Sequence, residues 1–263
     1  MRRPEELLER CYVDSPDDID LEVIAFEAGL EVRDRALTGC EASLVGYGDK
    51  GIVTVTTGVS PERRRFSIAH EIGHWEQHRG QSFSCRIEER ALDKAAKSKE
   101  READDYASTL MMPTGLFKEA IQMNKGSVSL SLVSKLAATF RSSFPAAAIR
   151  YVELSGEPVV LVFTGVGNAR RWTSRSRRVP EHLWIKTGID GDSFASDLVH
   201  ATELTKRQGK MPAEAWFDSV SEDRNLQEHS IRFAEGIYTL LHLTDEELLE
   251  ERMSAKRAWR NRE

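Results

Sequence analysis

A helix with a well-defined start and a His-Glu-x-x-His pentad inside it is the feature that most constrains this chain. Ser60, Pro61 and Glu62 supply an N-cap, a proline at the first helical position and an acid near the positive end of the helix dipole. The following residues, 63–78, have apolar side chains at helical spacing and polar ones on the other side. The pentad, residues 70–74, is therefore predicted to lie within a helix.

This pentad places two imidazoles and a carboxylate where they can serve one metal ion. Residues four apart lie about 40° apart around a helix, so His70 and His74 share a face. A catalytic zinc takes three protein ligands and leaves one position open. Glu71 can accept a proton from metal-bound water and return it to a leaving amine, while the metal polarises the scissile carbonyl. We expect Zn²⁺ here, with Mn²⁺ as the alternative metal; the competing interpretation is a chance pentad on an amphipathic helix.

The third metal ligand has to come from another segment, and a second predicted helix, which runs from residue 100 to 112, is rich in acids. Glu100, Glu102, Asp104 and Asp105 are all carboxylates that could reach a metal. Their spacing alone does not choose among them.

The two segments together resemble the ImmA/IrrE family of metallopeptidases. That family carries H-E-[IL]-G-H followed by E-A-x-x-[FY]-A-x-x-[LM]-[LM]-M-P, and residues 65–74 (RFSIAHEIGH) and 102–113 (EADDYASTLMMP) match in the same order. The resemblance covers about residues 17–155. It implies that Glu102 is the third ligand, in a gluzincin-like arrangement; Asp105 could then support the site from behind.

Short β-rich segments at 30–37, 42–47 and 52–57 precede the pentad and predict a small antiparallel sheet. In zincin-like folds a sheet edge near the metal receives substrate as an added strand, and Ile52–Thr57 is the nearest candidate.

Two further helical segments, 130–140 and 144–154, flank a short turn and resemble a helix-turn-helix, which members of this family often carry. Reading DNA requires side chains that reach base edges, and Phe144–Arg150 offers almost none. We therefore favour a packing role for these helices.

The character of the sequence changes at Pro158, where Val159–Phe163 predicts a buried strand and His182–Lys186 another. Some family members carry a small sensor-like module at this place. The overall expectation is an α+β fold with three parts, which are a gluzincin-like zinc peptidase domain (1–125), a helix-turn-helix-like segment (126–155) and a C-terminal α/β sensor-like or regulatory domain (156–263).

A predicted loop between these strands holds Trp172 and five arginines, which are Arg170, Arg171, Arg175, Arg177 and Arg178. Such a patch could bind an anion or nucleic acid. The net charge of −6 gives no broad basic field, however, so a solvated loop is favoured and direct nucleic-acid binding is not expected.

Several other features narrow the class of protein. No apolar run approaches the roughly 20 residues of a membrane-spanning helix, and the opening residues lack the apolar core of a secretory signal. Cys11, Cys40 and Cys85 are odd in number and form no C-x-x-C pair, which disfavours a disulfide framework. These features favour a cytoplasmic protein without a membrane partner; no feature specifies an oligomeric state.

The family resemblance implies a zinc endopeptidase with a narrow protein substrate, commonly a helix-turn-helix repressor of mobile-element or stress genes. The alternative is a DNA- or partner-binding transcriptional regulator whose zinc is structural. Structural zinc sites are usually closed by four protein ligands, and only three are visible in this sequence, so the peptidase is favoured.

Overall fold

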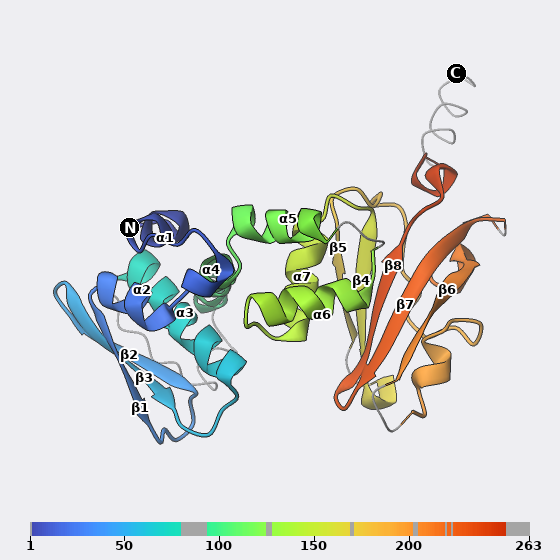
Figure 1. Cartoon of the computed structure of the whole chain (residues 1–263). Helices are drawn as coiled ribbons and strands as arrows, with labels where there is room; N and C mark the ends of the chain where they lie inside the picture. The colour runs from blue at the N-terminus through green and yellow to red at the C-terminus, as the bar shows by residue number, and fades with distance from the viewer. Residues whose placement is uncertain are drawn as a thin grey trace. The chain divides into compact units, whose positions relative to one another are not determined.

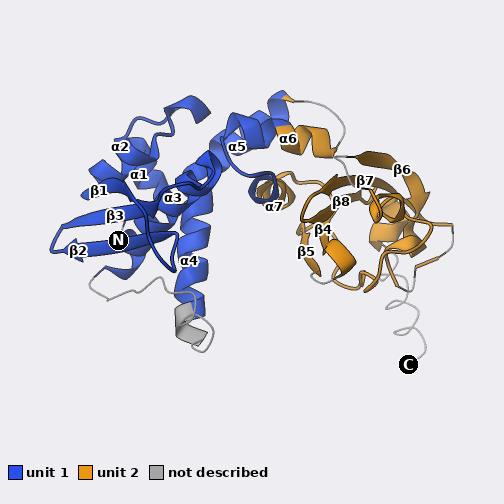
Figure 2. Cartoon of the chain, turned by 90° about the horizontal axis from the view of Figure 1, so that it is seen from below, with its two compact units in different colours: residues 1–123, 135–147 blue, residues 124–134, 148–263 orange. Residues whose placement is uncertain are grey.

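The structure is a computed structural model that describes residues 2–79, 94–124, 128–168, 171–201, 205–218, 220–221 and 223–250 (Figure 1). It contains helices and two separate sheets, as the predicted α+β class requires. The chain divides into two compact units, residues 1–123 with 135–147 and residues 124–134 with 148–263 (Figure 2). Residues 126–155 are shared between these units, and the three-part division stays a prediction.

Unit 1 begins with two short helices and a three-stranded sheet. The elements are α1 (Pro4–Arg10), η1 (Pro16–Asp18), α2 (Leu21–Glu27), β1 (Leu30–Arg35), β2 (Ala42–Tyr47) and β3 (Lys50–Thr56). Asp20 caps α2, because its carboxylate accepts the N–H of Glu22 and of Val23. A tight turn at Gly48 and Asp49 then joins β2 to β3, and Gly48 has the positive φ (63°) that such a turn favours.

The sheet is mixed, which corrects the expectation of an antiparallel one. Its order is β1-β3-β2, with β3 antiparallel to β2 and parallel to β1. The residues of the turn specify the β2–β3 hairpin locally. The pairing of β3 with β1 depends instead on contacts between residues far apart in the sequence, which no turn residue determines. Because β3 is paired on both sides, Ile52–Thr57 cannot be the sheet edge that accepts a substrate strand; the edges are β1 and β2.

Helix α3 (Pro61–His78) carries the pentad and begins where the sequence predicts. The Ser60 hydroxyl accepts the N–H of Arg63 at 3.2 Å, and Pro61 occupies the first turn. The helix packs on the sheet through Trp75, whose indole Nε1 donates to the Ala28 carbonyl at 2.8 Å. A Cβ built on Gly46 of β2 would lie 2.3 Å from the Trp75 ring, so a strand residue without a side chain is needed there.

Helix α4 (Lys94–Met111) lies directly against α3, and the two backbones come closest at Gly73. A Cβ at this position would lie 3.0 Å from the Ala103 carbonyl oxygen and 3.1 Å from the Tyr106 Cβ. The glycine of the pentad thus permits the close approach that brings acids of α4 to the histidines of α3.

After α5 (Thr114–Met123), helices α6 (Leu130–Thr139) and α7 (Phe144–Leu154) form the expected helix–turn–helix-like pair. Arg141 in the turn has a positive φ of 49° and donates to the Ile19 carbonyl at 3.0 Å. Much of α7 is buried, as its Ala147, Tyr151 and Val152 are at most 2% exposed.

Unit 2 is built on a five-stranded antiparallel sheet with the order β5-β4-β8-β7-β6. Its elements are β4 (Val159–Gly165), η3 (Val166–Asn168), β5 (Arg171–Arg175), η4 (Ser196–Leu198), β6 (Lys206–Pro212), η5 (Ala213–Ala215), β7 (Asn225–Phe233) and β8 (Gly236–His242). Val160 and Leu241 of the sheet and Leu183, Trp216 and Phe217 from the connections share one buried core. The strand predicted at His182–Lys186 is reduced to a single bridge between Ile185 and Phe217.

The predicted arginine loop is largely a strand. Arg171 and Arg175 lie on β5 and use their guanidinium groups within unit 2. Arg171 donates to the Lys186 carbonyl at 2.6 Å, and Arg175 donates to the Leu183 carbonyl at 2.7 Å. These arginines therefore fix the following connection, while Arg170 lies outside the described residues. None of the described helices is long and apolar enough to cross a bilayer.

Candidate metal centre

Two histidines of α3 and one glutamate of α4 converge on a single point. The Nε2 atoms of His70 and His74 lie 3.0 Å apart, and each is 3.4 Å from a carboxylate oxygen of Glu100. Both imidazoles are buried, with 8% of His70 and 1% of His74 exposed. In the described part of the chain, this trio is the group whose potential metal-ligand atoms lie within 4.8 Å of one another.

These distances fit a zinc ion. Ligand atoms at about 2.0–2.1 Å in tetrahedral geometry are separated from one another by about 3.3 Å. The two Nε2 atoms are 3.0 Å apart, and the separations of 3.4 Å run from His70 to Oε2 and from His74 to Oε1 of Glu100, so the three groups lie at a spacing close to that value. Two imidazoles and one glutamate are also a known donor set for catalytic zinc, which keeps its fourth position for water or substrate. The residues present therefore suit the metal that the sequence predicts.

Glu102, the ligand that the family resemblance implies, points elsewhere. Its carboxylate lies 3.1 Å from His78 Nε2 and accepts a hydrogen bond from Ser98 Oγ at 3.0 Å. Residues two apart on a helix face nearly opposite directions, so Glu100 and Glu102 cannot both reach the same two imidazoles. The structure brings together His70, His74 and Glu100, and it places Glu102 outside that trio.

A second carboxylate holds His70 from behind. Asp104 Oδ1 lies 2.9 Å from His70 Nδ1, so the ring keeps Nε2 directed at the trio. Asp104 occupies this position in place of its neighbour Asp105. Burial is the largest influence on the pKa of His70 and lowers it, but hydrogen bonds to Asp104 and Glu100 raise the pKa overall to about 9.

His74 is held by a longer chain of contacts. Its Nδ1 lies 3.1 Å from Nδ1 of His78, whose Nε2 in turn meets Glu102. Hydrogen bonds from His78 and Ser98 lower the pKa of the Glu102 carboxyl. His78 and Glu102 thus lie behind the trio, where they can fix the orientation of the His74 ring.

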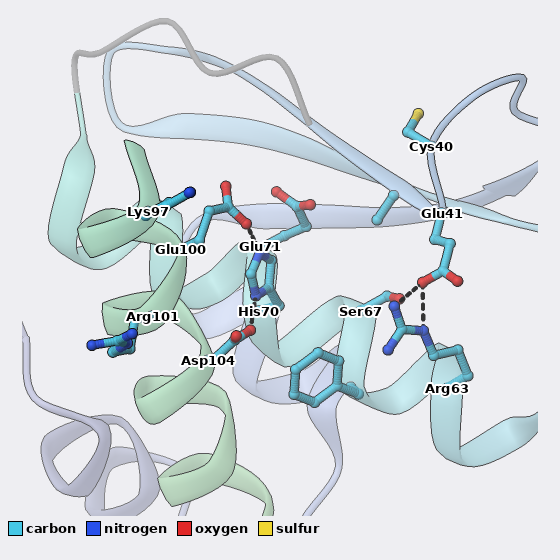
Figure 3. Close-up of a pocket in the computed structure, with 12 residues that line it drawn as sticks. Cys40, Glu41, Arg63, Ser67, His70, Glu71, Lys97, Glu100, Arg101 and Asp104 are labelled. Atoms are coloured by element: carbon cyan, nitrogen blue, oxygen red, sulfur yellow. Dashed lines mark hydrogen bonds and ion pairs between the residues drawn. The ribbon is translucent and has the colours of Figure 1, made fainter. Parts of the chain in front are cut away.

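Glu71 completes the group beside the trio. It is 1% exposed, yet it lines a pocket of about 640 Å³ together with His70 and Glu100. In Figure 3 the carboxylates of Glu71 and Glu100 lie on one side of the His70 ring, and Asp104 lies on the opposite side. Glu71 is thus a carboxylate that can accept and donate a proton beside the three potential metal ligands.

Sequence reasoning placed Glu100 among four eligible acids and then selected Glu102. A signal for the geometry was present, because Glu100 and Asp104 are four residues apart and hence on one helix face. The arrangement requires one acid to meet Nε2 and a second acid to meet Nδ1 of the same histidine. Glu102 and Asp105, three residues apart, also share a helix face, so this spacing alone does not select the pair.

A His-Glu-x-x-His helix that receives a glutamate from a neighbouring helix, beside a mixed sheet, forms a group that could bind a metal ion. The family model Peptidase_M78, described as the IrrE N-terminal-like domain, matches residues 20–151. The chain therefore belongs to this family of ImmA/IrrE peptidases, as the two sequence motifs predict.

Comparison with solved structures supports the fold and gives no information about the function. The structure is similar to that of a Mycobacterium tuberculosis transcriptional regulator, with a TM-score of 0.58 and 15% sequence identity over 91% of this chain and 86% of the other. At this identity the likeness shows a shared fold. No curated protein matches this sequence.

Proposed function

We propose that this chain is an intracellular zinc-dependent endopeptidase in which His70, His74 and Glu100 bind the metal and Glu71 is the general base. The observation that carries the proposal is the convergence of the three ligand groups at 3.0–3.4 Å beside a buried carboxylate in an open pocket.

When bound, zinc supplies Lewis acidity to the scissile carbonyl and makes water more acidic. The residues of the chain do the rest. Glu71 accepts a proton from the attacking water on its carboxylate and delivers that proton to the leaving amine. Asp104 holds His70, and the His78–Glu102 pair holds His74, so both Nε2 atoms stay directed at the site.

The proposed substrate is a specific protein, such as a helix-turn-helix transcriptional repressor, whose cleavage alters expression of mobile-element or stress genes. Membership in the Peptidase_M78 family supports peptide hydrolysis. A fold shared with a protein described as a transcriptional regulator is consistent with a role in gene control.

The alternative function is that of a DNA- or partner-binding regulator with a structural zinc, and the α6–α7 pair is the observation in its favour. The surface of α7 argues against DNA reading. Arg150 is 9% exposed and pairs with Glu153 at 3.3 Å, and Glu153 is an exposed acid that a phosphate backbone would repel. We therefore rank the peptidase first.

The direct test in cells compares new protein N-termini between the wild type and Glu71→Gln, with and without DNA damage. The exchange keeps the shape of the side chain and removes the base. A small set of cuts that depends on Glu71 would establish a selective peptidase and identify its substrate. Equal sets of N-termini under both conditions, with zinc present in the wild type, would contradict the proposal.

A further inference from the structure

A second pocket of about 500 Å³ adjoins the pocket of the metal centre within unit 1. The two pockets share Arg63 and Phe66 of α3 in their walls. The remaining lining comes from the start of α3, the end of α4 and the α6–α7 turn, namely Ser60, Glu62, Met111, Ser142, Ser143, Phe144 and Ala146. The two pockets are therefore neighbours along α3.

Ser142, a residue in the lining of the second pocket, has a buried hydroxyl without a partner among the described residues. Ser142 is 6% exposed, and among the described residues its Oγ has no hydrogen-bond partner. The backbone N–H of Ser142 is already used, since it donates to the Ala137 carbonyl at 2.9 Å. Its neighbour Ser143 has a local role, because Ser143 Oγ accepts the Ala146 N–H at the start of α7. A buried polar atom without a partner is uncommon, and at this place a ligand can supply the partner.

The chemistry of the lining suits a polypeptide. Phe66, Met111 and Phe144 offer apolar surface, and the hydroxyl of Ser142 can donate to a carbonyl or accept from an amide. Along α3, the ten residues from Ser60 to His70 correspond to about 15 Å. An extended chain covers that length in about four to five residues.

Building on the proposed function, we propose that the second pocket is a substrate subsite. It receives an apolar side chain about four residues from the scissile bond, on one side of the cut, while Ser142 Oγ hydrogen-bonds the substrate backbone. The substrate class is thus an extended, unfolded or loop segment that spans both pockets. Peptides too short to reach the second pocket lose this contribution to binding.

Cleavage profiling with a library of proteome-derived peptides tests this subsite. The zinc-loaded wild type is compared with Ala146→Trp, which fills the second pocket, and with Ala138→Trp, a matched control at an exposed position on α6 outside either pocket lining. We expect the wild type and the control to prefer an apolar residue about four positions from the cut. Ala146→Trp should lose that preference, and kcat/KM for the best long peptide should fall at least tenfold, while that for a version truncated before this residue is unchanged.

Ser142→Ala provides the second measurement. Removing a buried hydroxyl without a partner should leave the melting temperature unchanged or raise it. Loss of one hydrogen bond to substrate should lower kcat/KM for the long peptide about fivefold or more and spare the truncated peptide. A wild type that cleaves no library peptide and also yields no Glu71-dependent cuts in cells refutes the proposed function and, with it, the subsite. A wild type that cuts proteins in cells but cleaves no library peptide overturns the subsite alone, because the subsite needs only an extended segment. Cleavage by the wild type with identical profiles and rates in Ala146→Trp and Ser142→Ala overturns the subsite alone.

Discussion

In each imidazole of the candidate metal centre, Nδ1 contacts a neighbouring side chain, and this neighbour differs between the two histidines. His70 meets the carboxylate of Asp104 directly, at 2.9 Å, whereas His74 meets a second imidazole that itself contacts Glu102. A carboxylate behind a histidine fixes its tautomer and increases its basicity toward a metal. Asp104 should therefore contribute to metal affinity although it binds no metal itself.

Replacing Asp104 by Ala should weaken zinc binding by about 10–100-fold, the usual effect of removing such a partner. Asp105→Ala, at the exposed neighbouring position, is the matched control and should bind zinc like the wild type. Competition with a chromogenic zinc chelator measures both affinities. Equal affinities for the two variants would show that Asp104 does not support the site.

The structure brings together only some of the residues predicted for the site, for a physical reason. The pentad supplied His70, Glu71 and His74 because their spacing on one helix is a local property. The choice between Glu100 and Glu102 depends on the rotation of α4 against α3, which is set by packing between the helices. A motif that begins at Glu102 gave no information about that rotation.

At the scale of elements, the α3–α4 contact determines whether the site exists. Gly73 allows the backbone of Ala103 to approach so closely that an added Cβ would sit at 3.0 Å from its carbonyl oxygen. Neither neighbour is the end of a flexible side chain, so the helices themselves would have to move apart. Glu100, three residues before Ala103, would move away from the histidines with them.

Gly73→Ala should consequently lower zinc affinity, and overpacking of about 1–3 kcal/mol should outweigh the gain of about 1 kcal/mol in helix propensity, so that the unfolding free energy falls. Gly115→Ala on α5 is the control, because an added Cβ there meets no atom within 4 Å. Chemical denaturation and zinc titration of both variants test the prediction. A Gly73→Ala protein with wild-type stability and zinc affinity would mean that the close approach is not required.

Elements with strong local signals were the ones that sequence located. Ser60 and Pro61 marked the start of α3, and the Gly48 turn marked the β2–β3 hairpin. The parallel pairing of β1 with β3 was missed, because strand order depends on distant contacts. The segment His182–Lys186, expected to be a strand, is a connection held by hydrogen bonds from arginines of β5. The pattern of apolar residues within the segment does not indicate such long-range hydrogen bonds.

At the scale of the whole molecule, the two units carry different chemistry. The trio of ligands, Glu71 and both adjoining pockets belong to unit 1. In unit 2, the charged groups with the clearest contacts serve its own fold; Glu228, which is fully buried, accepts from Trp216 Nε1 at 2.8 Å and from Ser230 Oγ at 2.6 Å. Composition and net charge do not reveal this division, which depends on long-range contacts within each unit; a sensor-like or regulatory role for the C-terminal part stays a prediction.

The zinc content of Glu100→Gln and Glu102→Gln tests most directly whether Glu100 is the third metal ligand. Both variants are dialysed at a free zinc concentration that saturates the wild type, and His70→Ala is the metal-free reference. We expect Glu102→Gln to retain close to a full equivalent of zinc, because Glu102 contacts His78 and not the metal site, and Glu100→Gln to lose most of it. Full zinc in Glu100→Gln together with loss of zinc in Glu102→Gln would contradict the metal centre described here.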